Sequence, residues 1–258
     1  MRRLTNSWNG KLSFLIILLL MCAGFAPPTG GITQDLTNLS LKLAEHKYEA
    51  EVELTLFQGD AAKTVLEKKH MSISTWKNKM YFKAGDMEFI ANEHVQVTIN
   101  HKAKVILINK NNLDKTSQIV KQMIPVIFDS LLEQKANLKE LSVNGELHTI
   151  RITHSIEQSK VSYVDFTYSD QTYSPSQYII QYKYPIEEVF GQQSNTNTSS
   201  GELPQLKLEY KVFKYLNEPS KVRFDISKYC LKQEDGSYKK NAAFQQYELL
   251  DYSTKKLK

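Results

Sequence analysis

Alternation of hydrophobic and polar residues is the dominant pattern in this chain. Between residues 48 and 56 every second position is apolar: Tyr48, Ala50, Val52, Leu54 and Leu56. The intervening positions carry three glutamates and Thr55. A period of two is typical of a β-strand with one buried face and one solvated face. We therefore predict a half-buried strand here, with the glutamates on its wet side.

The same period predicts a meander of short strands over residues 64–75, 78–83, 87–91, 95–99 and 103–108. Turn-forming residues separate them, among them Gly85 and the pair Asn92-Glu93. Val95, Val97 and Ile99 form the apolar face of the fourth of these strands. The run 105–108 is apolar at every position, which predicts a strand buried on both faces.

Helical spacing replaces the alternation in two places. Leu36, Leu39 and Leu43 predict a short helix, with Thr33 or Asp35 as its N-cap. Apolar residues also recur at helical spacing between residues 112 and 132, where Pro125 predicts a kink or two successive helices. The wide apolar stripe of this second region suits core packing, and contact with lipid is the alternative.

A second meander follows the long helical pattern. Asn144-Gly145 predicts a two-residue hairpin, and further strands are predicted at 147–153, 161–168, 178–184, 206–215 and 221–229, with an edge strand or docking segment at 244–252. Tyr178, Ile180, Tyr182 and Tyr184 would share one strand face. Such a tyrosine row can line an amphipathic pocket or pack across strands. The polar stretch near 191–203 is predicted to be a disordered loop.

The N-terminus changes the picture by predicting export. Basic residues precede an apolar segment at 14–26, which is shorter than the roughly 20 residues that cross a bilayer. We interpret residues 1–26 as a signal peptide; an uncleaved anchor is the alternative. Lipidation at Cys22 is a further alternative, although Met21 before it departs from the lipoprotein pattern. If Cys22 leaves with the signal peptide, Cys230 has no partner in the chain, and we predict that its thiol is buried.

Candidate chemistry is sparse. The sequence contains no phosphate-binding glycine loop, no metal-ligand pair at helical spacing and no nucleophile elbow. Its net charge of +5 is spread along the chain without a basic stripe interleaved with aromatics, which argues against nucleic acid as a partner. We expect a protein that is not an enzyme and has neither cofactor nor metal.

The order of these elements resembles the LolA-type periplasmic carriers of outer-membrane lipoproteins. The resemblance covers residues 35–184 and rests on a helix, a meander ending in EFIANEHVQVTINHKAKVILI, a helical segment and a meander opening with ELSVNGELHTIRIT. It implies a mainly β fold with a few helices, in which a curved antiparallel sheet forms a half-open barrel covered by helices. It further implies binding of acyl chains. The family latches its lid with an arginine from an early strand, whereas no arginine occurs between Arg3 and Arg151.

We therefore expect residues 32–258 to form a single LolA-like β domain, located in the periplasm or at the outer membrane of a Gram-negative bacterium. Its partner would be a hydrophobic ligand or a lipoprotein acyl chain, bound without catalysis. The expected lining residues are Val52, Leu54, Leu56, Val97, Ile99, Tyr178, Ile180 and Tyr182. The alternative is a structural or protein-interaction module of the envelope, whose barrel is filled by its own side chains and which binds an envelope protein.

Overall fold

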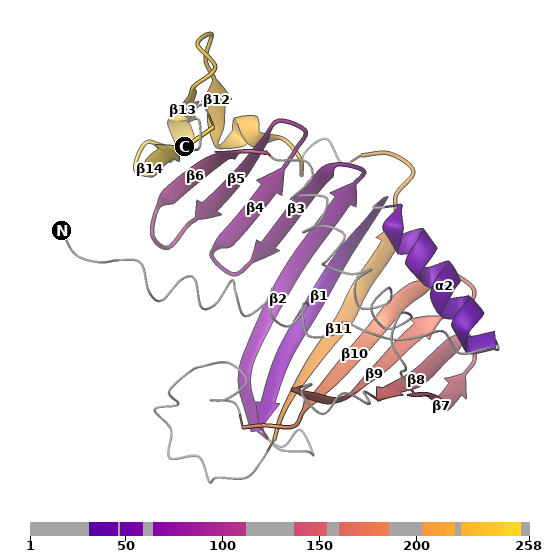
Figure 1. Ribbon diagram of the computed structural model, residues 1–258. Coiled ribbons are helices and arrows are strands. Elements are labelled where there is room, and N and C mark those ends of the chain that lie inside the picture. Colours follow the sequence, from indigo (N-terminus) through magenta and orange to yellow (C-terminus); the bar gives the residue numbers. More distant parts are fainter. Residues whose placement is uncertain are drawn as a thin grey trace. The chain divides into compact units, whose positions relative to one another are not determined.

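The computed structural model describes residues 31–45, 47–58, 64–111, 137–153, 160–185, 203–219 and 223–253 (Figure 1). The segment interpreted as a signal peptide, the long helical pattern after residue 112 and the polar loop near 191–203 lie outside these ranges. Within them, no helix is both long enough and apolar enough to cross a membrane.

The described chain is mainly β, as predicted, with one α-helix. Its strands are β1 (Lys47–Gln58), β2 (Thr64–Trp76), β3 (Lys79–Ala84), β4 (Met87–Ala91), β5 (Val95–Asn100), β6 (Val105–Lys110), β7 (Asn137–Asn144), β8 (Leu147–Thr153), β9 (Val161–Ser169), β10 (Ser174–Tyr182), β11 (Pro204–Tyr215), β12 (Cys230–Lys232), β13 (Tyr238–Lys240) and β14 (Glu248–Asp251). The helix is α2 (Gly31–Ala44), and two short 3-10 helices are η1 (Ile226–Lys228) and η2 (Ala242–Phe244).

Twelve strands form one sheet in the order β14-β6-β5-β4-β3-β2-β1-β11-β10-β9-β8-β7, and β12 pairs with β13 separately. The order has two different end strands, so the sheet is not closed in the described chain. Where the register is defined, neighbours are antiparallel except for β14, which runs parallel to β6. Gly85 and Gly145 turn two of the hairpins with φ of +53° and +61°, where a side chain would be strained.

Two compact units share the chain, and each contains parts of the long strands β1, β2 and β11. The first unit comprises residues 1–44, 53–68 and 121–210, and the second comprises residues 45–52, 69–120 and 211–258. The expectation of a single domain over residues 32–258 stays a prediction.

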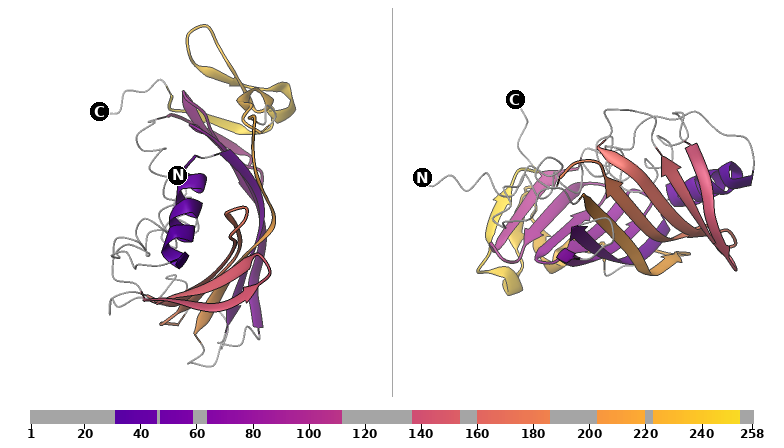
Figure 2. Two further views of the ribbon diagram at one scale, coloured as in Figure 1. Left: turned by 90° about the vertical axis from the view of Figure 1, so that its right-hand side faces the viewer. Right: turned by 90° about the horizontal axis from the view of Figure 1, so that it is seen from below.

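In the first unit, α2 lies beside strands β8 to β11 (Figures 1 and 2). Its helical spacing is confirmed, because Leu36, Leu39 and Leu43 are all buried. The predicted caps are wrong. The helix begins at Gly31, so Thr33 lies inside it and its carbonyl oxygen accepts a hydrogen bond from the Thr37 hydroxyl at 2.8 Å.

In the second unit, the apolar face of β4, β5 and β6 is covered by the C-terminal segment 226–249. The cluster contains Ile90, Val95, Val97, Ile99, Ile106 and Ile108 from the sheet, and Tyr229, Cys230, Tyr238 and Tyr247 from the segment. A buried carboxylate holds this contact, because Glu88 accepts a hydrogen bond from Tyr229 and pairs with Lys83 at 3.0 Å. Burial of the thiol, predicted from sequence, is confirmed, and it raises the pKa of Cys230 to about 12.

Four further sequence predictions need correction. The predicted strand 221–229 is wrong in its described part: Asp225 accepts a hydrogen bond from the Ser227 amide and starts η1 instead. Tyr184 lies beyond the end of β10 and is exposed. Thr55, expected on the wet face, is buried. The strand at 105–108 is only half-buried at Val105 and Leu107, so it is not buried on both faces.

We predict that Leu39→Ala lowers the free energy of unfolding by about 2–5 kcal/mol, because Leu39 is fully buried and its truncation leaves a cavity. Leu41→Ala is the matched control on the same helix. Leu41 is 65% exposed, so its truncation should change stability by less than about 0.5 kcal/mol. Urea denaturation of both variants measures this, and equal effects would contradict the packing of α2.

Candidate functional site

A row of aromatic rings crosses three strands of the first unit. Phe166 and Tyr168 belong to β9, Tyr178 to β10 and Tyr210 to β11. The ring of Phe166 lies 5.4 Å from that of Tyr168 and 4.4 Å from that of Tyr178, and Tyr178 lies 6.0 Å from Tyr210, centroid to centroid. The register explains the row, because Tyr178 is directly opposite Phe166 on β9 and Leu208 on β11. Residues directly opposite share one face of a sheet.

Aliphatic side chains complete this face, which we call the aromatic face. Ile180 is paired with Val164 on one side and Leu206 on the other, and all three are buried. The tyrosines add polar tips to an otherwise apolar surface. Burial, followed by the nearby carboxylate of Asp35, raises the pKa of Tyr168, so its phenol stays protonated across the physiological range.

Helix α2 is attached to the aromatic face at the β9–β10 turn. The Asn38 side-chain amide donates to the Tyr173 hydroxyl at 3.2 Å, and the Lys42 ammonium donates to the Thr172 carbonyl oxygen at 3.0 Å. Lys42 also lies 5.8 Å from the centre of the Tyr173 ring. These contacts orient the helix, and the buried leucines supply most of its attachment, at roughly 1.5–3 kcal/mol for each fully buried side chain.

All eight lining residues predicted from sequence are buried. Leu54, Leu56, Tyr178, Ile180 and Tyr182 belong to the first unit. Val52, Val97 and Ile99 belong to the second, where Val97 and Ile99 contact the chain's own C-terminal segment. Whether any of the eight contacts a ligand stays a prediction.

The sequence analysis missed three members of the aromatic row: Phe166, Tyr168 and Tyr210. The signal for the first two was present, because Val164, Phe166 and Tyr168 alternate on a predicted strand beside the predicted tyrosine row. Tyr210 carried the same signal, because it alternates with polar residues in step with Leu206 and Leu208 on the predicted strand 206–215.

One end of the aromatic row carries an ionic group. His148 stacks on Tyr168 at 5.7 Å. Its Nδ1 lies 2.9 Å from a Glu140 carboxylate oxygen and its Nε2 lies 3.1 Å from one of Asp170. Hydrogen bonding to Glu140, and then to Asp170, raises the pKa of His148 above its usual value. The His148 side chain thus joins the edge strand β7 to the β9–β10 turn.

The remaining clustered side chains form ion pairs. Glu51 on β1 accepts hydrogen bonds from Ser72 at 2.6 Å and from Arg223 at 3.2 Å, and lies 2.9 Å from His70. Burial alone would raise the pKa of Glu51, but these hydrogen bonds lower it. Ser72 and His70 both bind the carboxylate, so this cluster lacks the serine–histidine hydrogen bond that activates a nucleophile. Among the described residues, no group of three or more acidic, histidine or cysteine side chains could hold a metal ion.

We predict that His148 makes stability depend on pH. Because its folded-state pKa is raised, the stabilisation is fully present below the unfolded-state pKa of about 6.5 and is lost as pH rises through the folded-state value. The group is partly solvated, so the effect should stay below about 1 kcal/mol. Urea denaturation of wild type and His148→Gln should differ more at about pH 5.5 than at about pH 8.5. A stability difference between wild type and His148→Gln that does not change with pH would contradict the prediction.

Comparisons with known proteins give remote similarities of fold. No family model and no curated protein matches the chain. An uncharacterised conserved protein from Thermus thermophilus is 9% identical with a TM-score of 0.40, covering 80% of this chain and 97% of that one. A putative outer membrane lipoprotein-sorting protein domain from Vibrio parahaemolyticus is 12% identical, covering 76% and 95%, with a TM-score of 0.30. A LolA superfamily protein from Nitrosomonas europaea is 9% identical, covering 74% and 97%, with a TM-score of 0.29. The structural neighbours of the chain thus include LolA superfamily proteins.

Proposed function

We propose that this is an exported envelope protein that binds a lipid, an acyl chain or another hydrophobic ligand without transforming it. The ligand would lie against the aromatic face, in contact with Tyr178, Ile180 and Tyr182, and with Leu54 and Leu56 of the same unit. The site would be the interior of a LolA-like half-open barrel, as inferred from the order of elements along the chain. The predicted signal peptide supports a location in the periplasm or at the outer membrane.

The observation that carries this proposal is the stacked row Tyr168–Phe166–Tyr178 beside an amphipathic helix. Flat rings beside aliphatic side chains favour an alkyl chain, and phenol tips can bind a carboxyl or ester group at its end. Each methylene moved from water to such a surface contributes about 0.8 kcal/mol. A long-chain ligand could therefore bind without any charged group in the site.

Helix α2 would provide access. Asn38 and Lys42 contact the β9–β10 turn, and three buried leucines add apolar contacts. A ligand that replaces the leucine contacts with its own chain offsets the cost of moving the helix. The helix would then act as a cover hinged at the β9–β10 turn.

We predict that the protein binds fatty acids with an affinity that rises with chain length, by up to about fourfold per methylene between about 10 and about 16 carbons. Tyr178→Ala should weaken binding by roughly tenfold, because it removes the central ring of the row. Leu41→Ala, on the exposed side of α2, should leave it unchanged. Displacement of a fluorescent fatty acid measures the affinities, and native mass spectrometry detects ligand that co-purifies.

Val97→Ala tests whether Val97, which belongs to the predicted lining but packs against the C-terminal segment, contributes to binding. A loss equal to that of Tyr178→Ala would support its place in the lining. Absence of binding, or affinities independent of chain length, would contradict the proposal.

A second candidate is an envelope interaction module, favoured by the edge strand β7. This strand is exposed at almost every position, including Leu141 at 41% and Val143 at 55%. Exposed edge strands can pair with a strand of another protein. A photo-crosslinker placed at Val143 in cells should then capture an envelope protein that the same group at Leu41 does not capture. Equal capture at both positions would argue against an edge-specific partner.

A further inference from the structure

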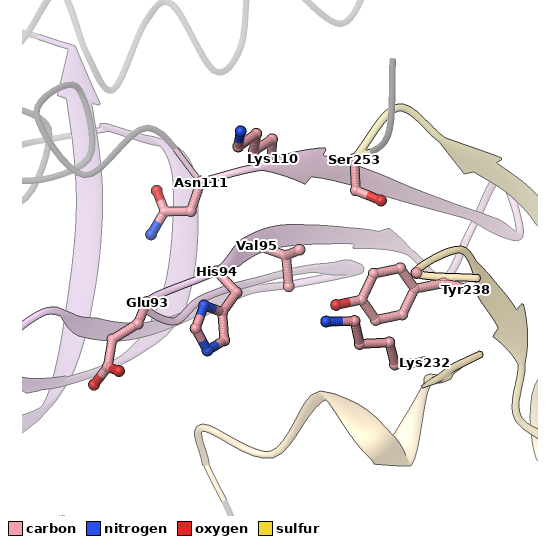
Figure 3. Close-up of a pocket in the computed structure, with 9 residues that line it drawn as sticks. Glu93, His94, Val95, Lys110, Asn111, Lys232, Tyr238 and Ser253 are labelled. Atoms are coloured by element: carbon pink, nitrogen blue, oxygen red, sulfur yellow. The ribbon is translucent and has the colours of Figure 1, made fainter. Parts of the chain in front are cut away.

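The second unit contains a polar pocket of about 250 Å³ (Figure 3). Three separate parts of the chain line it: the turn before β5 with the start of that strand, the end of β6, and the C-terminal segment. The residues are Glu93, His94, Val95, Lys110, Asn111, Lys232, Gly236, Tyr238 and Ser253. Lys232 and Tyr238 are direct partners on β12 and β13, and the Lys232 ammonium lies beside the phenol.

Hydrogen bonds fix the strand ends on one side of this pocket. The Asn92 side chain accepts from the amides of His94 and Val95 at 2.9 and 3.1 Å. The Asn111 amide donates to the His94 carbonyl oxygen at 2.8 Å, and the Asn111 side chain donates to the Asn92 carbonyl oxygen. Gln96 donates to Asn111 at 3.1 Å. The backbone that presents His94 is therefore held in place without any ligand.

Three basic side chains of this pocket have no acidic partner among the described residues: His94, Lys110 and Lys232. Elsewhere in the described chain, five lysines form ion pairs with glutamates. Lys68, Lys83 and Lys214 pair with glutamates at 3.0 Å, and Lys47 and Lys207 at 3.3 and 2.9 Å. The pocket thus gathers three uncompensated basic groups from distant parts of the sequence.

The acidic groups nearby form no ion pair with them among the described residues. Asp251 is already engaged, since it accepts from the Tyr238 amide at 2.9 Å and from the amide and hydroxyl of Ser253 at 2.9 and 2.6 Å. Glu93 lines the rim, but its carboxylate points away from Lys232 and Tyr238 (Figure 3). A negatively charged ligand would supply the missing charge.

We propose that this pocket binds a phosphate group, either of a small soluble phosphate or of a lipid headgroup. The pocket is below the usual range of about 300–1,000 Å³ for drug-sized ligands, and its charged rim disfavours an acyl chain. Lysines binding as point charges from separate directions suit tetrahedral phosphate oxygens, whereas planar carboxylates are commonly recognised by an arginine fork, which the pocket lacks. His94 and the Tyr238 phenol supply further hydrogen bonds. This site does not depend on the proposed lipid face of the first unit.

The test compares two double variants of equal charge. Lys110→Gln/Lys232→Gln removes both ammonium groups of the pocket, and Lys102→Gln/Lys239→Gln removes two exposed lysines of the same unit outside it. Calorimetric titration with inorganic phosphate and with glycerol 3-phosphate measures soluble binding. Flotation with phosphatidylcholine vesicles, with and without phosphatidylglycerol, measures headgroup binding. All four lysines are exposed, so unchanged circular dichroism and unfolding midpoints should show that the variants fold.

We expect the pocket variant to weaken binding of at least one probe by about tenfold or more, and the control variant by less than about twofold. If the pocket variant loses only its binding of soluble phosphate compounds, the ligand is a small molecule. If it loses only its binding of phosphatidylglycerol vesicles, the ligand is a lipid headgroup. Absence of binding to every probe, or equal losses in the two double variants, would overturn the proposal. Fatty acid binding by the pocket variant should stay at the wild-type level, which separates this site from the aromatic face.

Discussion

Covering the apolar face of the sheet is the constraint on which the rest of this structure depends. Period-two alternation gives each strand a face that cannot remain in water, and antiparallel pairing joins these faces across neighbouring strands. Each unit meets the requirement with a different element. In the first, helix α2 contributes three buried leucines. In the second, the C-terminal segment contributes aromatic side chains and Cys230.

The two covers differ in how they are attached. The C-terminal segment returns to the sheet as β14, which pairs with β6, and it is also held through Tyr229 and the buried carboxylate of Glu88. Withdrawing that segment would break both the strand pairing and the hydrogen bond between Tyr229 and Glu88. Helix α2 has no strand pairing, and its polar contacts are made by side chains such as Asn38 and Lys42. Under the proposed function, the first unit is therefore the part in which a ligand would replace the cover.

Alternation was sufficient to predict most of the strands because the signal lies in neighbouring residues. The Asn144-Gly145 hairpin and the burial of Leu36, Leu39 and Leu43 were predicted from local pattern and are confirmed. Of the two alternatives predicted at 244–252, an edge strand is present, but only at 248–251. The prediction failed at 221–229, where one side-chain acceptor, Asp225, redirected an alternating stretch into η1. The cap prediction at α2 failed for a similar reason. Thr33 and Asp35 have side chains that can cap a helix, but both residues lie inside this one.

The phosphate pocket shows why part of a site is not visible in the sequence. His94, Lys110 and Lys232 are each ordinary surface residues when considered alone, and none of them belongs to a run of basic residues. Antiparallel pairing of β5 with β6 brings the first two together, and the β12–β13 hairpin adds the third. What they share, beyond lining one pocket, is the absence of acidic partners among the described residues. Ion pairing depends on which side chains lie close together in the folded protein. It can therefore be recognised only when the strand order and register are known.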